Sequence, residues 1–122
     1  MSNTDRLKIE PYKDVLYCEA RMDDEFTVAD LNLLREEIRA HYQGCIDIIM
    51  NKVGEYSVSV ETQRILRQGI AEFRHFAYVV ESKVKRASAE FAASTYMAPY
   101  RPQITGSKEH AYVLLHAIAH VK

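Results

Sequence analysis

Short apolar segments typical of strands alternate with longer amphipathic segments along the chain, and this alternation constrains the fold more than any other feature of the sequence. Residues 6–11 and 14–21 are strand-like and are separated by Tyr12-Lys13, which predicts a hairpin near the start of the chain. Three further strands are predicted at 45–51, 75–82 and 100–107, and four helices at 26–44, 58–73, 83–97 and 108–122.

The order of these elements is β-β-α-β-α-β-α-β-α within 122 residues. Helices of about 12–15 residues that connect successive strands favour right-handed crossovers and parallel strand pairing. The sequence therefore predicts an α/β fold, built on a single mixed, mostly parallel sheet with an antiparallel strand at its edge. The length of the chain and the lack of internal repeats or a linker predict one domain over residues 1–122.

The predicted helices carry recognisable boundary residues and inner faces. Thr27, followed three residues later by Asp30, is a variant of the capping box and marks the start of the first helix. In the third helix, helical spacing predicts that Val84, Ala87, Phe91 and either Thr95 or Ala92 face inward.

The charge of the chain is nearly balanced, with 16 basic and 17 acidic residues and a net charge of −1. This balance argues against a nucleic-acid partner, which needs a strong positive field. No segment approaches the run of about 18 apolar residues that spans a membrane, and the first ten residues lack the apolar core of a secretory signal. Cys18 and Cys45 each lie in an apolar stretch, so we expect buried, reduced thiols and a cytoplasmic protein.

The C-terminal third carries the most specific family pattern. A valine-rich strand leads into an alanine-rich helix, and a short strand with a small-residue turn leads into a helix that opens with acidic residues and alanine. With the order of elements, this pattern resembles the SpoIIAA-like (STAS-like) fold of anti-sigma-factor antagonists and their uncharacterised bacterial relatives. The resemblance covers nearly the whole chain and implies a bacterial regulatory or protein-binding module. The matching residues are Val79, Val80, Ala89, Phe91, Ala92, Ser107, Glu109, Ala111 and Leu115.

In regulatory members of that family, an Asp-Ser or Ser-Thr pair followed by glycine ends the third strand, and a partner kinase phosphorylates the serine. Here the third strand ends in Met50-Asn51-Lys52, and two serines follow only after Gly54. We expect Tyr56, Ser57 and Ser59 to form a partner surface or a phosphorylation site. The alternative is that one of the serines caps the second helix, which contributes about 1 kcal/mol.

A second candidate site lies at the start of the third helix, where Ser82, Lys83, Lys85 and Arg86 gather. Backbone N–H groups at a helix start, together with these side chains, form a candidate site for a phosphate or carboxylate. The alternative is a solvated charged turn. Because ligands of α/β sheets bind at the carboxyl ends of strands, we expect this turn and the loop 51–59 to face one crevice.

The remaining polar and aromatic residues point to no cofactor, metal or catalytic group. His116 and His120 are four residues apart on the last helix, but no zinc motif accompanies them. No glycine-rich phosphate loop or nucleophile elbow occurs, so no enzyme is predicted. Seven tyrosines are expected to serve in ordinary packing or, alternatively, to line an apolar ligand space. These are Tyr12, Tyr17, Tyr56, Tyr78, Tyr96, Tyr100 and Tyr112.

The sequence therefore favours a non-enzymatic regulatory or protein-binding module, whose surface for a protein partner centres on residues 51–59 and the adjoining second helix. The alternative is a module that binds a small apolar or anionic ligand, such as a lipid, in a crevice between 51–59 and 82–86. The edge strand and the apolar helix faces leave room for a homodimer, but the composition does not demand one.

Overall fold

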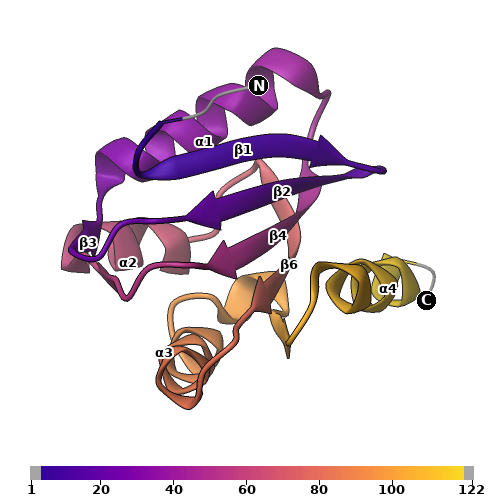
Figure 1. Ribbon diagram of the computed structural model, residues 1–122. Helices are drawn as coiled ribbons and strands as arrows, with labels where there is room; N and C mark the ends of the chain where they lie inside the picture. Colours follow the sequence, from indigo (N-terminus) through magenta and orange to yellow (C-terminus); the bar gives the residue numbers. More distant parts are fainter. Residues whose placement is uncertain (1–3, 120–122) are drawn as a thin grey trace.

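A five-stranded sheet forms the centre of the molecule in the computed structural model, which describes residues 4–119. The strand order is β1-β2-β4-β6-β7, and Figure 1 shows β1, β2, β4 and β6 side by side. β1 and β2 are antiparallel, whereas β2-β4, β4-β6 and β6-β7 are parallel. The predicted mixed, mostly parallel sheet is confirmed. Its strands are β1 (Leu7–Tyr12), β2 (Val15–Ala20), β4 (Ile46–Lys52), β6 (Phe73–Val79) and β7 (Gln103–Thr105).

Four helices connect or follow the strands in the predicted order, and two very short strands are added. The helices are α1 (Val28–His41), α2 (Val60–Arg67), α3 (Lys83–Ser94) and α4 (Lys108–Ala119), with a 3₁₀ turn at Ala98–Tyr100. β3 (Glu25–Phe26) and β5 (Ser57–Val58) pair in parallel as a separate small sheet. Sequence periodicity missed these two strands because two residues are too few to show an alternating pattern.

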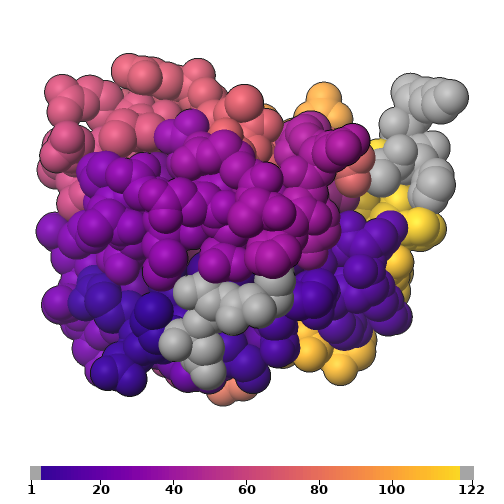
Figure 2. Space-filling view, turned by 90° about the horizontal axis from the view of Figure 1, so that it is seen from above, coloured from indigo at the N-terminus to yellow at the C-terminus, as the bar shows by residue number. Residues whose placement is uncertain are grey.

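The two faces of the sheet are covered unequally. Residues of α1, α2 and α3 pack on one face over the larger core. On the other face, Ala111 and Leu115 of α4 pack against Tyr17, Ile49 and Ala77 in a smaller core. Seen from above in Figure 2, the purple and magenta surface of α1 lies beside the pink surface of α2. Neighbouring residues of a strand belong to different cores because strand side chains alternate between faces.

The start of α1 has the local interactions that the sequence predicts. The Thr27 side chain accepts a hydrogen bond from the backbone N–H of Asp30, and the Asp30 carboxylate accepts one from the Thr27 backbone. Asp30 also accepts a hydrogen bond from Arg6 Nε at 3.0 Å, which ties the helix start to the segment before β1. The predicted capping box is confirmed.

The structure corrects the predicted inward face of α3. Val84 and Phe91 are 68% and 60% exposed, and Ala87 is exposed as well. Ala92 is buried, as one of the predicted alternatives required, and Ala89 is buried beside it. The two alanines lack long side chains and so allow the helix backbone to lie close to the rest of the fold. Helical periodicity of the larger apolar residues therefore selected the wrong face.

Two smaller sequence predictions were also wrong. The second helix was expected to reach residue 73, but α2 ends at Arg67, and Gly69 follows with a left-handed φ of 84°. Glycine adopts this conformation without the steric cost that other residues meet, so it stops the helix. Cys18 is buried as expected, but Cys45 is exposed just before β4.

Within residues 4–119, no helix has the length and apolar character needed to cross a bilayer.

Candidate functional site

The carboxyl end of β4 and the beginning of α3 enclose a hollow that opens to solvent at one end of the sheet. It has a volume of about 250 Å³. We call it the rim hollow, and its walls are Lys52, Gly54, Glu55, Tyr56, Ser57, Val84, Lys85 and Ser88. The prediction that segments 51–59 and 82–86 face one crevice is thereby confirmed.

Hydrogen bonds to the backbone of the loop after β4 hold it in place on both sides. The N–H of Gly54 donates to the carbonyl of Ala20 at 2.9 Å. Lys85 Nζ donates to the carbonyl of Val53 at 2.7 Å, which joins the loop to α3. A Cβ on Gly54 would lie 1.9 Å from the carbonyl oxygen of Met22, so this close approach of two backbone segments requires glycine.

Lys52 is the most unusual residue of the rim hollow. As the last residue of β4, it is only 5% exposed. Its Nζ lies 3.7 Å from the centroid of the Tyr56 ring and 5.5 Å from that of the Tyr78 ring. No hydrogen bond or ion pair joins this ammonium to another residue of the described chain. A cation over an aromatic face is attracted by the ring, but this attraction replaces only part of the hydration that burial removes.

The environment of Lys52 favours its neutral form. Burial, and secondarily the positive charge of Lys85, lower the pKa of Lys52 from the ordinary value of 10.5 to about 8. Desolvation acts in this direction because it destabilises the charged form of an amine. A lysine with a pKa near neutrality carries positive charge at pH 7 but releases its proton easily.

Sequence analysis missed Lys52, although the sequence contained a signal for it. Ile46, Ile48 and Met50 alternate along β4 and face the larger core. Lys52 continues this two-residue period, so the alternation places its side chain on the same face. A lysine that continues a fully apolar strand face is therefore a signal of an unusually buried amine.

Of the three residues predicted as a partner or phosphorylation site, Tyr56 and Ser57 line the hollow, but only Ser57 is exposed. Tyr56 is 7% exposed and contacts Phe26 and Lys52. Ser59 is the N-cap of α2, because its side chain accepts a hydrogen bond from the backbone N–H of Thr62 at 3.2 Å. The capping interpretation is confirmed for Ser59.

The residues of the cationic turn 82–86 also differ in their roles, since only some of them line the hollow. Ser82 is the N-cap of α3, with its side chain accepting from the backbone N–H of Lys85 at 3.2 Å. Lys85 lines the rim hollow, whereas Lys83 and Arg86 are exposed and lie outside its lining. The structure therefore groups Lys85 with Lys52 instead of with its neighbours in sequence.

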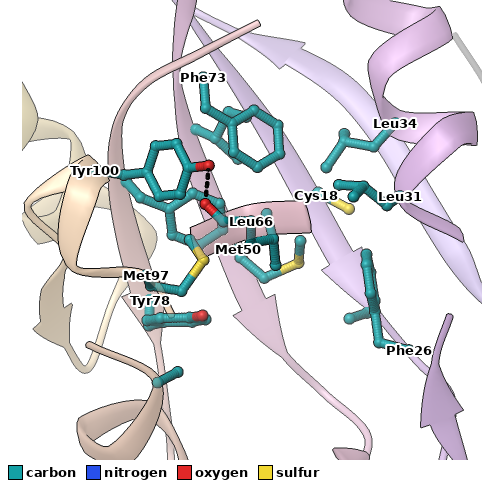
Figure 3. Close-up of a cluster of buried hydrophobic side chains, with 14 of the residues drawn as sticks. Cys18, Phe26, Leu31, Leu34, Met50, Leu66, Phe73, Tyr78, Met97 and Tyr100 are labelled. Carbon is teal, nitrogen blue, oxygen red and sulfur yellow. Dashed lines mark hydrogen bonds between the residues drawn. The ribbon is translucent and has the colours of Figure 1, made fainter. Parts of the chain in front are cut away.

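A small apolar cavity lies behind Tyr56, between the sheet and the helices of the larger core. Figure 3 shows Met50, Tyr78 and Met97 directed toward this part of the core. The cavity has a volume of about 30 Å³, enough for roughly one water-sized group. Among the described residues, its lining comprises Phe26, Leu31, Leu34, Met50, Tyr56, Val58, Leu66, Phe73, Phe76, Tyr78, Tyr96 and Met97.

The seven tyrosines do not share one space. Tyr56, Tyr78 and Tyr96 line the small cavity, and Tyr100 lies in the same core. Tyr12, Tyr17 and Tyr112 belong to the smaller core on the opposite face of the sheet. The idea of a single tyrosine-lined ligand space is therefore wrong.

A second polar cluster, at the beginning of β4 and β6, is closed by its own contacts. Asp47 is 2% exposed and accepts hydrogen bonds from Arg74 Nε at 2.8 Å and Arg74 Nη2 at 2.9 Å. The backbone N–H of His75 donates to the same carboxylate at 3.1 Å. This cluster joins two central strands, and three donors from β6 already bind the Asp47 carboxylate. The structure contains no metal-binding group of His, Cys, Asp or Glu within residues 4–119, and His120 lies outside the described residues.

Comparisons with known proteins identify the fold but not a function. No protein-family model matches this chain, and no curated protein is significantly similar to it in sequence. A solved structure from Shewanella loihica PV-4 matches 94% of this chain and 98% of its own, with a TM-score of 0.59 and 19% sequence identity. That structure is described as an uncharacterised protein of the DUF3478 family with a SpoIIAA-like fold.

The chain therefore has the SpoIIAA-like fold, and the resemblance stated from the sequence is confirmed at this level. The same fold serves different functions in different proteins, so any function has to be argued from the rim hollow.

Proposed function

We propose that this protein is a non-enzymatic binding module that holds a small organic anion, with a carboxylate or phosphate group, in the rim hollow. The observation that supports this most directly is Lys52. It is a lysine that is only 5% exposed, lines the hollow and forms no ion pair within the described chain. A buried charge is normally paired, and an anionic ligand is the missing partner of this charge.

Lys85 and the start of α3 supply the rest of the anion site. One N–H of the Lys85 ammonium is used on the carbonyl of Val53, and the other two remain available for a ligand. α3 begins at Lys83, and the positive end of its macrodipole adds to the field at the hollow. Glu55 also lines the hollow, which favours ligands of low negative charge over polyanions.

The volumes favour a small anion over a lipid. A space of about 250 Å³ lies just below the range of roughly 300–1,000 Å³ for drug-sized ligands. The apolar cavity behind Tyr56 has only about 30 Å³, which is too small for an acyl chain. Of the two ligand classes that the sequence left open, the anionic one is therefore preferred.

Thermal unfolding in low salt tests this proposal with pyruvate, succinate and inorganic phosphate as probes. Binding only to the folded state at 100 times Kd stabilises the protein by about 2.7 kcal/mol. We expect a saturable rise in Tm for the wild-type protein that is lost in Lys52→Met and Lys85→Met. Lys83→Met is the matched control, since Lys83 is a lysine in the same helical turn but outside the hollow. The proposal fails if none of the probes raises the Tm, or if the control loses as much as Lys85→Met.

A regulatory protein-binding role is a second candidate, supported by the exposed apolar side chains of α3. Val84 and Phe91 are exposed on that helix, and Val84 also forms part of the wall of the hollow. A partner that covers this surface would therefore respond to a ligand in the hollow. We expect Phe91→Ser to lose binding of such a partner. Val113→Ser changes an equally exposed residue on α4 and should still bind it. Equal retention by both variants would exclude α3 as the partner surface.

A further inference from the structure

The surroundings of Lys52 are those of a reactive amine as well as of an anion ligand. We propose that the rim hollow captures a small carbonyl acid, an aldehyde or ketone that also carries a carboxylate, as a reversible imine on Lys52 Nζ. This inference rests on the proposed anion site, because the carboxylate is held there while the carbonyl carbon approaches the amine.

The geometry gives the two lysines different roles: Lys85 binds the carboxylate, and Lys52 reacts with the carbonyl carbon. Lys85 Nζ is held at 2.7 Å from the Val53 carbonyl, so it is a fixed hydrogen-bond donor for the carboxylate. Lys52 Nζ faces the same hollow without a hydrogen bond or ion pair to the described chain, and aromatic rings lie beneath it. A nucleophilic amine needs this combination of access, desolvation and a neighbouring cation.

The step balances without any oxidant or reductant. The lone pair of the neutral Lys52 amine forms a C–N bond to the carbonyl carbon as the π bond of the carbonyl breaks, and the oxygen takes up the proton that the nitrogen loses, which gives a carbinolamine. The nitrogen then loses its remaining proton and the hydroxyl leaves as water, so that amine and carbonyl become imine and one water. Protonation of the imine returns a positive charge to the position 3.7 Å from the Tyr56 ring, where the ring stabilises it.

Burial, and secondarily the positive charge of Lys85, determine how much neutral amine is present at Lys52. The rings of Tyr56 and Tyr78 lie against its Nζ, and Glu55 also lines the hollow. With a pKa of about 8, roughly a fifth of the amine is neutral at about pH 7.4, against roughly a thousandth for a lysine at 10.5. This difference predicts faster imine formation at Lys52 than at exposed lysines.

The test uses the full chain with glyoxylate, an aldehyde with a carboxylate, and cyanoborohydride to reduce any imine to a stable secondary amine. Peptide mass spectrometry then gives the rate of labelling at each lysine between pH 6 and 10. We expect Lys52 to be labelled at least tenfold faster than Lys83 at pH 7.5, with saturation by glyoxylate and a midpoint near pH 8. Lys85→Met should raise the glyoxylate concentration that gives half-maximal labelling. Labelling by acetaldehyde, which lacks the carboxylate, should not become faster in the Lys85→Met variant.

Two outcomes separate this inference from the proposed function. If anions raise the Tm of the wild-type protein but Lys52 is labelled no faster than Lys83, the imine is refuted and the anion site stands. If Lys52 is labelled quickly by acetaldehyde and glyoxylate alike, without saturation, the reactive amine stands and the anion site is refuted. Lys52→Arg removes the reactive amine, so it should show no labelling at position 52. The wild-type pH profile tests the same point without any variant.

Discussion

Replacement of Lys52 by methionine should stabilise the protein at neutral pH. Methionine has a similar length and no charge, so it can keep the contacts with the rings of Tyr56 and Tyr78 while removing the buried ammonium. The pKa difference between 10.5 and about 8 corresponds to roughly 3 kcal/mol, at about 1.36 kcal/mol for each pKa unit. We therefore expect Lys52→Met to be more stable than the wild-type protein by about 3 kcal/mol at pH 7.

The pH dependence of this difference identifies its cause. Below pH 8, Lys52 is protonated in both the folded and the unfolded state, so the full cost of its burial is present. Between pH 8 and 10.5 the unfolded state binds more protons, so the stability of the wild-type protein gains a contribution as the pH rises. Above 10.5 the amine is neutral in both states, and the advantage of Lys52→Met should have largely disappeared.

Urea unfolding of both proteins between pH 7 and 11 measures this difference, because all other titrating groups are shared and cancel. Lys83→Met serves as the control and should differ from the wild-type protein by a small, constant amount. A difference between wild type and Lys52→Met that does not change with pH would refute the reasoning. So would a variant that is less stable at every pH. A stability cost of this size at a solvent-facing hollow is typical of residues retained for function.

Two further substitutions test the framework around the site. Gly54→Ala places a Cβ 1.9 Å from the Met22 carbonyl oxygen, so we expect a loss of about 1–3 kcal/mol in urea unfolding and loss of anion binding. Gly106→Ala has no atom within 4 Å and should be nearly neutral; equal effects would contradict the steric argument. Tyr100→Phe removes a hydroxyl that donates to the Leu66 carbonyl at 2.6 Å, drawn as a dashed line in Figure 3, and that accepts from a backbone N–H at 3.0 Å. We expect a loss of about 1–3 kcal/mol, and a change below about 0.5 kcal/mol would show that water replaces the hydroxyl.

The part of the candidate site that could be predicted is the part that depends on topology. Strands of a parallel sheet end at the same edge, so the loop after β4 and the turn before α3 had to approach each other if the strands were neighbours. The identity of the residues that line the hollow could not be derived in the same way. Lys83, Lys85 and Arg86 are equivalent in composition, and only the orientation of α3 selects Lys85.

That orientation depends on contacts between distant segments. α3 faces the core with Ala89 and Ala92, although Val84 and Phe91 have more apolar surface to bury. The turn at Ala98–Tyr100 and the edge strand β7 lie against this helix, and the small side chains allow them to lie close. Helical periodicity describes one element alone, so it cannot report such steric preferences.

The sequence by itself determined the order of the elements, the mixed sheet and the caps of α1 and α2. These features depend on patterns of residues a few positions apart, which can be recognised before the fold is known. Only the tertiary structure decided which lysines line the shared hollow, namely Lys52 and Lys85, 33 positions apart, and that Tyr56 lines both this hollow and the apolar cavity. The physical reason is that charge, burial and volume at a site are sums over all neighbouring segments, and those neighbours are known only once the chain has packed.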